Sequence, residues 1–210
     1  MTLRPKGAAK RAILAGADDV MIKPVAPGML LDRVTYFTMH RLPFIATSDY
    51  LGPERRRAGD PRASKIKHLD VINTLKAKIE GSRLSMADLD RAVRGNLNDM
   101  MAARLDANGL KLGSVCGLIL RAYEEKRVDK SVEALLRTLV DVLEDAIRTA
   151  QALGDPDLAQ VCAKLAHQVN AMAENYEKPT SDQFGTIQKL GTVFELAKAA
   201  KISPSAVARE

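Results

Sequence analysis

The sequence predicts a mainly α-helical protein in which a helical bundle follows a short α/β segment. Ala and Leu are its most frequent residues and favour helices over sheets, and aromatic residues make up only 4% of the chain. From residue 84 onward, apolar residues recur three and four positions apart, which is the spacing of a helix face. Within residues 1–40, a helical pattern, a short apolar run and a second helical pattern follow one another.

The composition excludes several classes of protein. Hydrophobic residues make up 46% and charged residues 28% of the chain, which suits a globular core. No apolar run approaches the length of about eighteen residues that a membrane span needs, and no apolar signal core follows Met1. Cys116 and Cys162 lie in helical patterns without a C-x-x-C pair, so we expect buried free thiols in a reducing cytoplasm.

The net charge of +6 is unevenly distributed. Residues 1–40 hold 6 basic and 3 acidic groups, and residues 41–83 hold 10 and 5. Residues 84–210 hold 16 basic and 18 acidic groups. The helical half is therefore slightly acidic, which argues against a broad nucleic-acid-binding face there.

The first elements are short. Residues 8–15 are expected to form a helix that Gly16 ends. Val20–Ile22 is expected to form a buried strand, which Pro24 ends because proline lacks a backbone donor. Pro27 suits the first turn of the next helix. That helix is expected to bury one apolar face, made by Met29, Leu30, Val34 and Phe37.

Two stretches in this region resemble a known family. Ala15-Gly-Ala-Asp-Asp-Val-Met-Ile-Lys-Pro-Val25 and Leu30-Leu-Asp-Arg-Val34 look like the last strand and last helix of a bacterial receiver domain, the phosphorylated module of two-component response regulators. The resemblance implies that Lys23 reaches the phosphoryl group and that its peptide bond to Pro24 is cis. It places Asp18 and Asp19 in the loop before the strand, not at the phosphoacceptor.

The resemblance also implies an incomplete receiver. In that family the phosphate-accepting Asp and the acidic metal pocket lie upstream of this strand, so this chain is expected to hold no phosphoacceptor and no metal site. Mg²⁺ and a sensor kinase are expected only for a complete receiver, and no other cofactor is expected. A lone strand would borrow a neighbour from another chain, stay unpaired, or belong to a piece of a longer gene product; we favour the last.

The following segment resembles a second part of these proteins. Residues 41–57 read Arg-Leu-Pro-Phe-Ile-Ala-Thr-Ser-Asp-Tyr-Leu-Gly-Pro-Glu-Arg-Arg-Arg, similar to the Pro-Phe-x-x-Thr-x-Asp-Tyr-x-Gly-Pro-Asp-Arg-Arg segment that follows the receiver in a group of proteobacterial response regulators. Glu54 replaces the usual Asp. The segment is rich in turn residues, so a linker is expected. Its basic cluster could contact phosphate or nucleic acid, or acidic partners within the chain: Arg55, Arg56 and Arg57.

Local signals define where the first helices of the helical half begin and end. Residues 71–79 are expected to form a helix ended by Gly81, and Ser85 and Asp88 form a capping pattern for the next. Asn108-Gly109 is expected to stop that helix, and residues 111–127 to form another. Gly109, Gly113 and Gly117 could permit a close helix crossing.

The last three helices have the clearest pattern. Residues 131–153 carry a heptad stripe that Gly154 ends, and Asp155-Pro156 supplies a cap and first turn for a helix with the same alternation. Thr180 or Ser181 caps the last helix. Short connections imply antiparallel neighbours in a bundle. Extra apolar residues widen the face of 131–153 and predict a contact between subunits: Leu135, Val140, Val142 and Ile147.

Two other functions are less well supported. His167 lacks the Lys and Gly that follow the histidine of a phosphotransfer bundle. Residues 195–209 resemble a helix-turn-helix core, but Lys201 replaces the turn glycine; the alternative is a helix end with a loose tail. The three His residues show no metal spacing, and no catalytic constellation is recognisable.

These observations predict a receiver end over 1–40, a basic linker over 41–67 and a helical bundle over 68–210. The expected function is non-enzymatic signalling in the cytoplasm by a response-regulator-like protein, through helical protein contacts or dimerisation. A DNA-binding transcriptional regulator is the alternative, and a structural helical module is the second. No membrane partner is expected.

Overall fold

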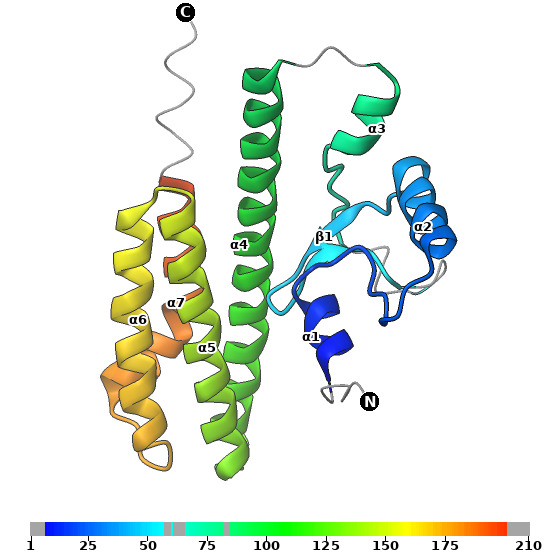
Figure 1. The fold of residues 1–210 in the computed structure, drawn as a ribbon. Coiled ribbons are helices and arrows are strands. Elements are labelled where there is room, and N and C mark those ends of the chain that lie inside the picture. Colours follow the sequence, from blue (N-terminus) through cyan, green and yellow to red (C-terminus); the bar gives the residue numbers. More distant parts are fainter. Residues whose placement is uncertain (1–6, 57–59, 61–65, 82–84, 201–210) are drawn as a thin grey trace, which may run out of the picture. The chain divides into compact units, whose positions relative to one another are not determined.

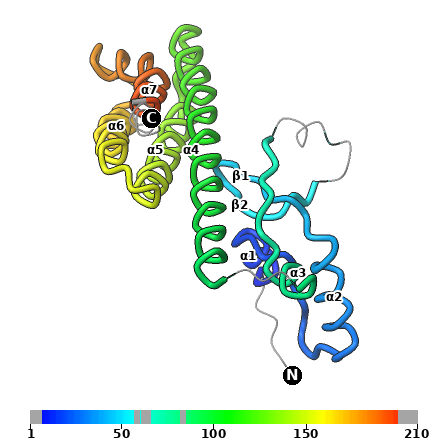
Figure 2. Tube along the Cα trace, turned by 90° about the horizontal axis from the view of Figure 1, so that it is seen from above, coloured from blue at the N-terminus to red at the C-terminus, as the bar shows by residue number. Residues whose placement is uncertain are grey.

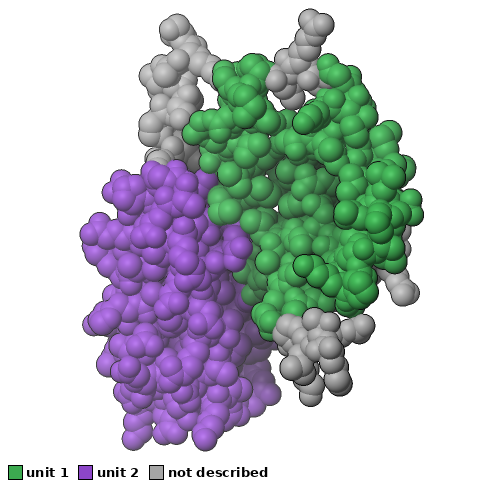
Figure 3. Space-filling model, in the orientation of Figure 1, with its two compact units in different colours: residues 1–103 green, residues 104–210 purple. Residues whose placement is uncertain are grey.

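The structure, a computed structural model, describes residues 7–56, 60, 66–81 and 85–200. This part of the chain is mainly helical, as predicted (Figure 1), and it divides into two compact units, residues 1–103 and 104–210 (Figure 3). The domain boundaries proposed from the sequence stay a prediction. The helices and strands of the chain, in order, are α1 (Ala8–Leu14), α2 (Pro27–Met39), β1 (Phe44–Ala46), β2 (Leu51–Pro53), α3 (Thr74–Ile79), α4 (Met86–Glu124), α5 (Lys130–Ala152), α6 (Pro156–Glu174) and α7 (Ser181–Ala200).

The end of α1 follows the prediction, but the strand after it does not form. Gly16 has a left-handed φ of 83°, and its N–H donates to the carbonyl of Ile13 at 3.0 Å. Residues 20–22 are not in a strand. The prediction of a strand there was wrong because the two strands that do form, β1 and β2, pair with each other instead.

Helix α2 begins at Pro27 as predicted, but its apolar face is not buried. Met29 is 55% exposed, Leu30 52% and Val34 41%, and Thr38 is the one residue that α2 buries. The expectation of a buried face was therefore wrong. Amphipathic spacing places apolar residues on one side of a helix, but only a packed neighbour can remove them from water.

The predicted linker contains the small sheet. Strands β1 and β2 are antiparallel, with Phe44 opposite Pro53 and Ala46 opposite Leu51. Thr47 closes the turn, since its hydroxyl accepts the N–H of Tyr50 at 3.0 Å. Phe44 and Ala46 pack with residues from two later segments into a small core that also holds Leu69 and Met100.

Helix α4 is a single helix of 39 residues, so the predicted stop at Asn108-Gly109 was wrong (Figure 2). The predicted start is confirmed, because the Ser85 hydroxyl accepts the N–H of Asp88 at 3.1 Å. Asn108 is fully buried, and its amide group donates to Asp145 at 3.0 Å. Gly109 lies against Phe194 of α7. These long-range contacts hold the helix where local propensity predicts an end.

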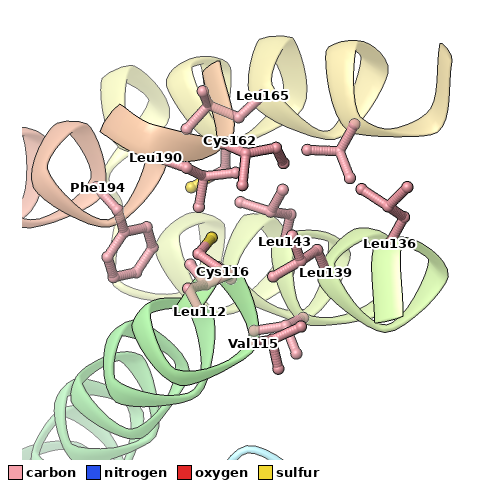
Figure 4. Packing of buried hydrophobic residues seen from close by; sticks show 14 of the residues in the cluster. Leu112, Val115, Cys116, Leu136, Leu139, Leu143, Cys162, Leu165, Leu190 and Phe194 are labelled. Carbon is pink, nitrogen blue, oxygen red and sulfur yellow. The ribbon is translucent and has the colours of Figure 1, made fainter. Parts of the chain in front are cut away.

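Helices α4 to α7 build the predicted bundle core (Figure 4). Asp155 caps α6 by accepting the N–H of Leu158 at 3.1 Å, and Thr180 and Gln183 cap α7 through reciprocal bonds of 3.3 and 2.9 Å. The heptad stripe of α5 is buried as predicted from Val132 to Ala150. The largest fully buried side chains of the bundle are Leu112, Ile119, Val132, Leu136, Leu139, Leu143, Leu158, Val169, Met172, Ile187, Leu190 and Phe194.

The extra apolar width of α5 is used inside the bundle. Val142 is buried, and Leu135, Val140 and Ile147 are partly buried and pack against the same core. The contact between subunits that we expected through these residues stays a prediction, since Leu135 and Val140 are only partly exposed. Among the described residues, no helix is both long enough and apolar enough to cross a membrane.

Candidate functional site

The predicted switch residues lie on the connection between α1 and α2. Lys23 and Pro24 are both exposed, and the peptide bond between them is cis, as the resemblance implies. Among the described residues, no group of three or more His, Cys, Asp or Glu side chains is placed to hold a metal ion.

The two aspartates of this connection are paired with arginines. Asp18 accepts two hydrogen bonds from Arg41, from Nε and from Nη2, both at 3.0 Å. Asp19 lies 3.4 Å from Nε of Arg33 on α2. A bidentate arginine–carboxylate pair fixes the orientation of both groups, so Asp18 holds the loop in place.

The basic cluster contacts the chain itself. Arg55 donates through Nη2 to the carbonyl oxygens of Ala17 and Asp18, the latter at 3.1 Å. Arg56 donates to the carboxylate of Glu54 at 2.9 and 2.7 Å. Arg57 lies outside the described residues. For Arg55 and Arg56 the geometry agrees with partners within the chain, and a phosphate contact stays a prediction.

Glu54 is the buried member of this cluster. It is 9% exposed, and Arg56 also donates its backbone N–H to the carboxylate at 2.8 Å. Burial alone raises the pKa of a carboxyl group, but the hydrogen bonds and the charge of Arg56 outweigh it, so the pKa of Glu54 lies below its usual value. Glu54 therefore stays ionised at neutral pH and keeps Arg56 in place.

The two segments that resemble response regulators touch at a pair of glycines. A Cβ atom added to Gly16 would lie 2.6 Å from the carbonyl oxygen of Leu51. A Cβ atom added to Gly52 would lie 2.7 Å from the Cα of Gly16 and 2.6 Å from the hydroxyl of Tyr50. Both glycines are thus required by a close backbone approach. The sequence contained a signal for this contact, since both motifs carry a glycine, but nothing in it paired the two.

Three polar residues of this region were missed by the sequence analysis. Arg41 donates through Nη1 to the carbonyl of Ile72 at 3.2 Å, and its guanidinium lies 4.8 Å from the centre of the Phe44 ring. Asn73 caps α3 and donates to the carbonyls of Phe37 and Thr38. Asn96 of α4 accepts the N–H of Ile72 at 2.8 Å. No short motif marks their long-range hydrogen bonds, because those partners are 23 or more positions away.

A groove of about 380 Å³ lies beside the aspartates. Its apolar lining comes from Met21, from α2 and from the start of α3, and includes Leu30, Val34 and Leu75. The ion pairs of Asp18 and Asp19 lie at the same groove.

The bundle offers little reactive chemistry among the described residues. Cys116 and Cys162 are free and buried, as predicted, and burial raises the pKa of each thiol to about 11. A thiol of that pKa is almost wholly protonated at neutral pH and is a poor nucleophile. His167 is exposed on α6.

The helix-turn-helix resemblance falls only partly within the structure. Residues 195–200 form the last turns of α7, and residues 201–209 lie outside the described part. Lys198 binds Asp106 of α4 and Glu195 of its own helix, each at 2.8 Å.

Comparison with known proteins returns no match: no protein-family model, no curated protein and no solved structure matches the chain.

Proposed function

We propose that this chain is a response-regulator-like signalling protein that acts in the cytoplasm without catalysis. The observation that carries the proposal is the direct packing of the two resembling segments on each other. Gly16 meets Gly52, and Arg55 of the second segment binds the carbonyls of Ala17 and Asp18 in the first. Two stretches that resemble the same family independently thus belong to one compact unit.

In this proposal the chain holds no phosphoacceptor of its own. Asp18 and Asp19 are the acidic residues nearest Lys23 in sequence, and both are held by arginines. An aspartate that accepts two hydrogen bonds from a guanidinium is a poor nucleophile toward phosphate, because its charge is already compensated. Lys23 would contact a phosphoryl group only if a complete receiver supplied one.

This part of the proposal is tested with labelled acetyl phosphate and Mg²⁺. We expect the purified chain to take up no label. Asp18→Asn and Asp19→Asn serve as controls that locate any label. Acid-labile, Mg²⁺-dependent label, the behaviour of an acyl phosphate, would contradict the proposal, and its loss in either variant would locate the modified residue.

The output is proposed to come from contacts of the helical bundle with a second copy of the chain. The apolar side chains that the bundle leaves exposed lie on α4 and α7 rather than on α5. Leu110 is 76% exposed, Leu118 52% and Leu196 66%. Apolar surface left in water costs roughly 25 cal/mol per Å², so covering these side chains would stabilise an assembly.

Sedimentation velocity tests the output at concentrations on the order of tens of micromolar. We expect the full chain to self-associate, and Leu110→Glu with Leu118→Glu to shift it to monomer. Lys164→Glu on α6 is the control, because it changes the charge of another exposed position of the bundle. If the wild-type chain sediments as a monomer, this part of the proposal is wrong. Binding to promoter DNA with a steep salt dependence would favour the helix-turn-helix alternative.

A further inference from the structure

A continuous series of hydrogen bonds connects the loop before Lys23 to helix α4. It begins at Asp18, whose carboxylate accepts Nε and Nη2 of Arg41. Arg41 then donates through Nη1 to the carbonyl of Ile72 at 3.2 Å. The N–H of Ile72 donates to Oδ1 of Asn96 at 2.8 Å. Residue 72 is therefore held from one side by Arg41 and from the other by α4.

A second set of contacts runs parallel to this series. The Arg41 guanidinium lies over the Phe44 ring, and Phe44 exchanges two backbone hydrogen bonds of 2.8 Å with Leu69. Phe44 and Leu69 pack in one cluster with Met100, one turn along α4 from Asn96. Asn96 also donates to the carbonyl of Asp70 at 3.2 Å. Residues 69–72 are thus attached to α4 by both polar and apolar contacts.

Arg41 is the point at which the two sets of contacts meet. Its side chain is 25% exposed and uses all three nitrogens in hydrogen bonds to residues 18 and 72. Bonds of a guanidinium to a carboxylate are about twice as strong as bonds between neutral groups. If Asp18 moves away, Arg41 loses its principal anchor, and its bond to Ile72 and its position over Phe44 weaken together.

We propose that Arg41 couples the conformation of the loop at Asp18 to the local stability of α4 around Asn96 and Met100. A displacement of the loop raises the frequency with which residues 69–72 and this part of α4 open. Because coupling free energies are reciprocal, loosening α4 at Asn96 also loosens the loop. The coupling is a property of the fold, and its use in signalling, from the Lys23 segment to the helical output, rests on the proposed function.

Amide hydrogen exchange of the full chain, resolved by peptide, measures this coupling. Arg41→Met keeps much of the side-chain volume but removes the hydrogen bonds. We expect exchange in residues 66–75 and 92–103 to become roughly fivefold faster, the effect of losing about one hydrogen bond's net contribution. Arg33→Met is the matched control, because it removes the neighbouring ion pair with Asp19 on the same loop. It should leave exchange in 92–103 within about twofold of the wild type.

Two further variants keep the test decisive if Arg41→Met perturbs the whole unit. Asp18→Asn preserves the shape of the side chain. It should also accelerate hydrogen exchange in residues 66–75 and 92–103, by a smaller factor than Arg41→Met. Asn96→Ala should accelerate exchange in residues 16–22, whereas Asn98→Ala, at an exposed position of the same helix, should not. The coupling would be overturned if Arg41→Met and Arg33→Met changed hydrogen exchange in residues 92–103 equally. It would also be overturned if Asn96→Ala left hydrogen exchange in residues 16–22 unchanged. Self-association and phosphate uptake report on the proposed function separately.

Discussion

At the scale of single residues, two buried or half-buried carboxylates organise the polar contacts of the two units. Asp18 fixes the loop before Lys23 through Arg41. Asp145 of α5 accepts two bonds from Arg104, at 2.7 and 2.8 Å, and a third from Asn108. Its side chain is 14% exposed. Each carboxylate joins segments more than twenty positions apart, so each acts on tertiary structure rather than on its own helix or loop.

Asp145 gives the bundle a dependence on pH. Burial raises the pKa of this carboxyl group. The hydrogen bonds from Arg104 and Asn108 and the charge of Arg104 lower the pKa by more than burial raises it, so the net pKa lies below the usual 3.8. A lowered native pKa means that the stabilisation is present above the pKa of the unfolded chain and is lost as pH falls through the native pKa.

Asp145→Asn should therefore lower the free energy of unfolding by roughly 1 to 3 kcal/mol at neutral pH, because Arg104 loses its charged partner. The difference from the wild type should shrink as pH falls below about 4. Urea unfolding followed by helical circular dichroism measures both. Asp141→Asn, at an exposed position of α5, is the control. A difference that stays constant down to the lowest pH would contradict the role given to the carboxylate.

Gly52 is the residue on which the packing of β2 against the loop depends. In Gly52→Ala the new methyl group would lie 2.7 Å from the Cα of Gly16, a backbone atom that cannot move without shifting the loop. We expect a loss of roughly 1 to 3 kcal/mol in the stability of residues 7–56, measured by hydrogen exchange in β1 and β2. Gly95→Ala, where nothing lies within 4 Å of the added atom, should not weaken these strands.

At the scale of elements, α4 is the clearest case in which neighbours decide the outcome. Its sequence holds Asn108-Gly109 in the middle and further glycines at 113 and 117. An interior glycine costs a helix about 1 kcal/mol relative to alanine. The contacts of this helix with Asp145 and Phe194 offset that cost. At an estimated 1.5 Å per residue, the uninterrupted helix is about 58 Å long.

Alanine substitutions at two glycines of α4 should change the stability of the bundle in opposite directions. In Gly109→Ala the added atom would lie 3.0 Å from a ring carbon of Phe194, which is fully buried, so we expect the thermal midpoint of the bundle to fall. In Gly117→Ala nothing lies within 4 Å, so the higher helix propensity should raise stability by up to about 1 kcal/mol. Thermal unfolding of both variants checks this; a rise for Gly109→Ala would refute the close packing of α4 on α7.

At the scale of the whole molecule, the two units differ in how they bury apolar surface. The larger cluster lies wholly between Leu105 and Phe194, and the smaller one is centred on Phe44, Leu69 and Met100. Helix α2 of the first unit keeps Leu30, Leu31 and Val34 largely in water. Stability from burial is therefore concentrated in the bundle.

Residues 84–210 should accordingly fold without residues 1–83. We expect the isolated fragment to show strong helical circular dichroism and a cooperative thermal transition, because its core residues contact one another. The transition should lie within a few degrees of the bundle's transition in the full chain. Weak helical signal without a cooperative melt would show that the bundle depends on the first unit.

Local signals in the sequence determined several helix ends and the buried stripe of α5. The cap at Asp155-Pro156, the turn at Gly16 and the stripe from Val132 to Ala150 depend on residues within about seven positions, and each is found as predicted. The mainly helical fold class follows from the same signals.

Tertiary structure alone decided the features that depend on distant partners. The strand expected at Val20–Ile22 is absent from the described structure because a strand needs a neighbour that local pattern cannot supply. Helix α4 continues past Asn108-Gly109 because buried contacts outweigh a propensity difference of about 1 kcal/mol. The contacts of Arg41, Gly52 and Asn96 could not be predicted, since their partners are chosen by the folded backbone and not by spacing along the chain.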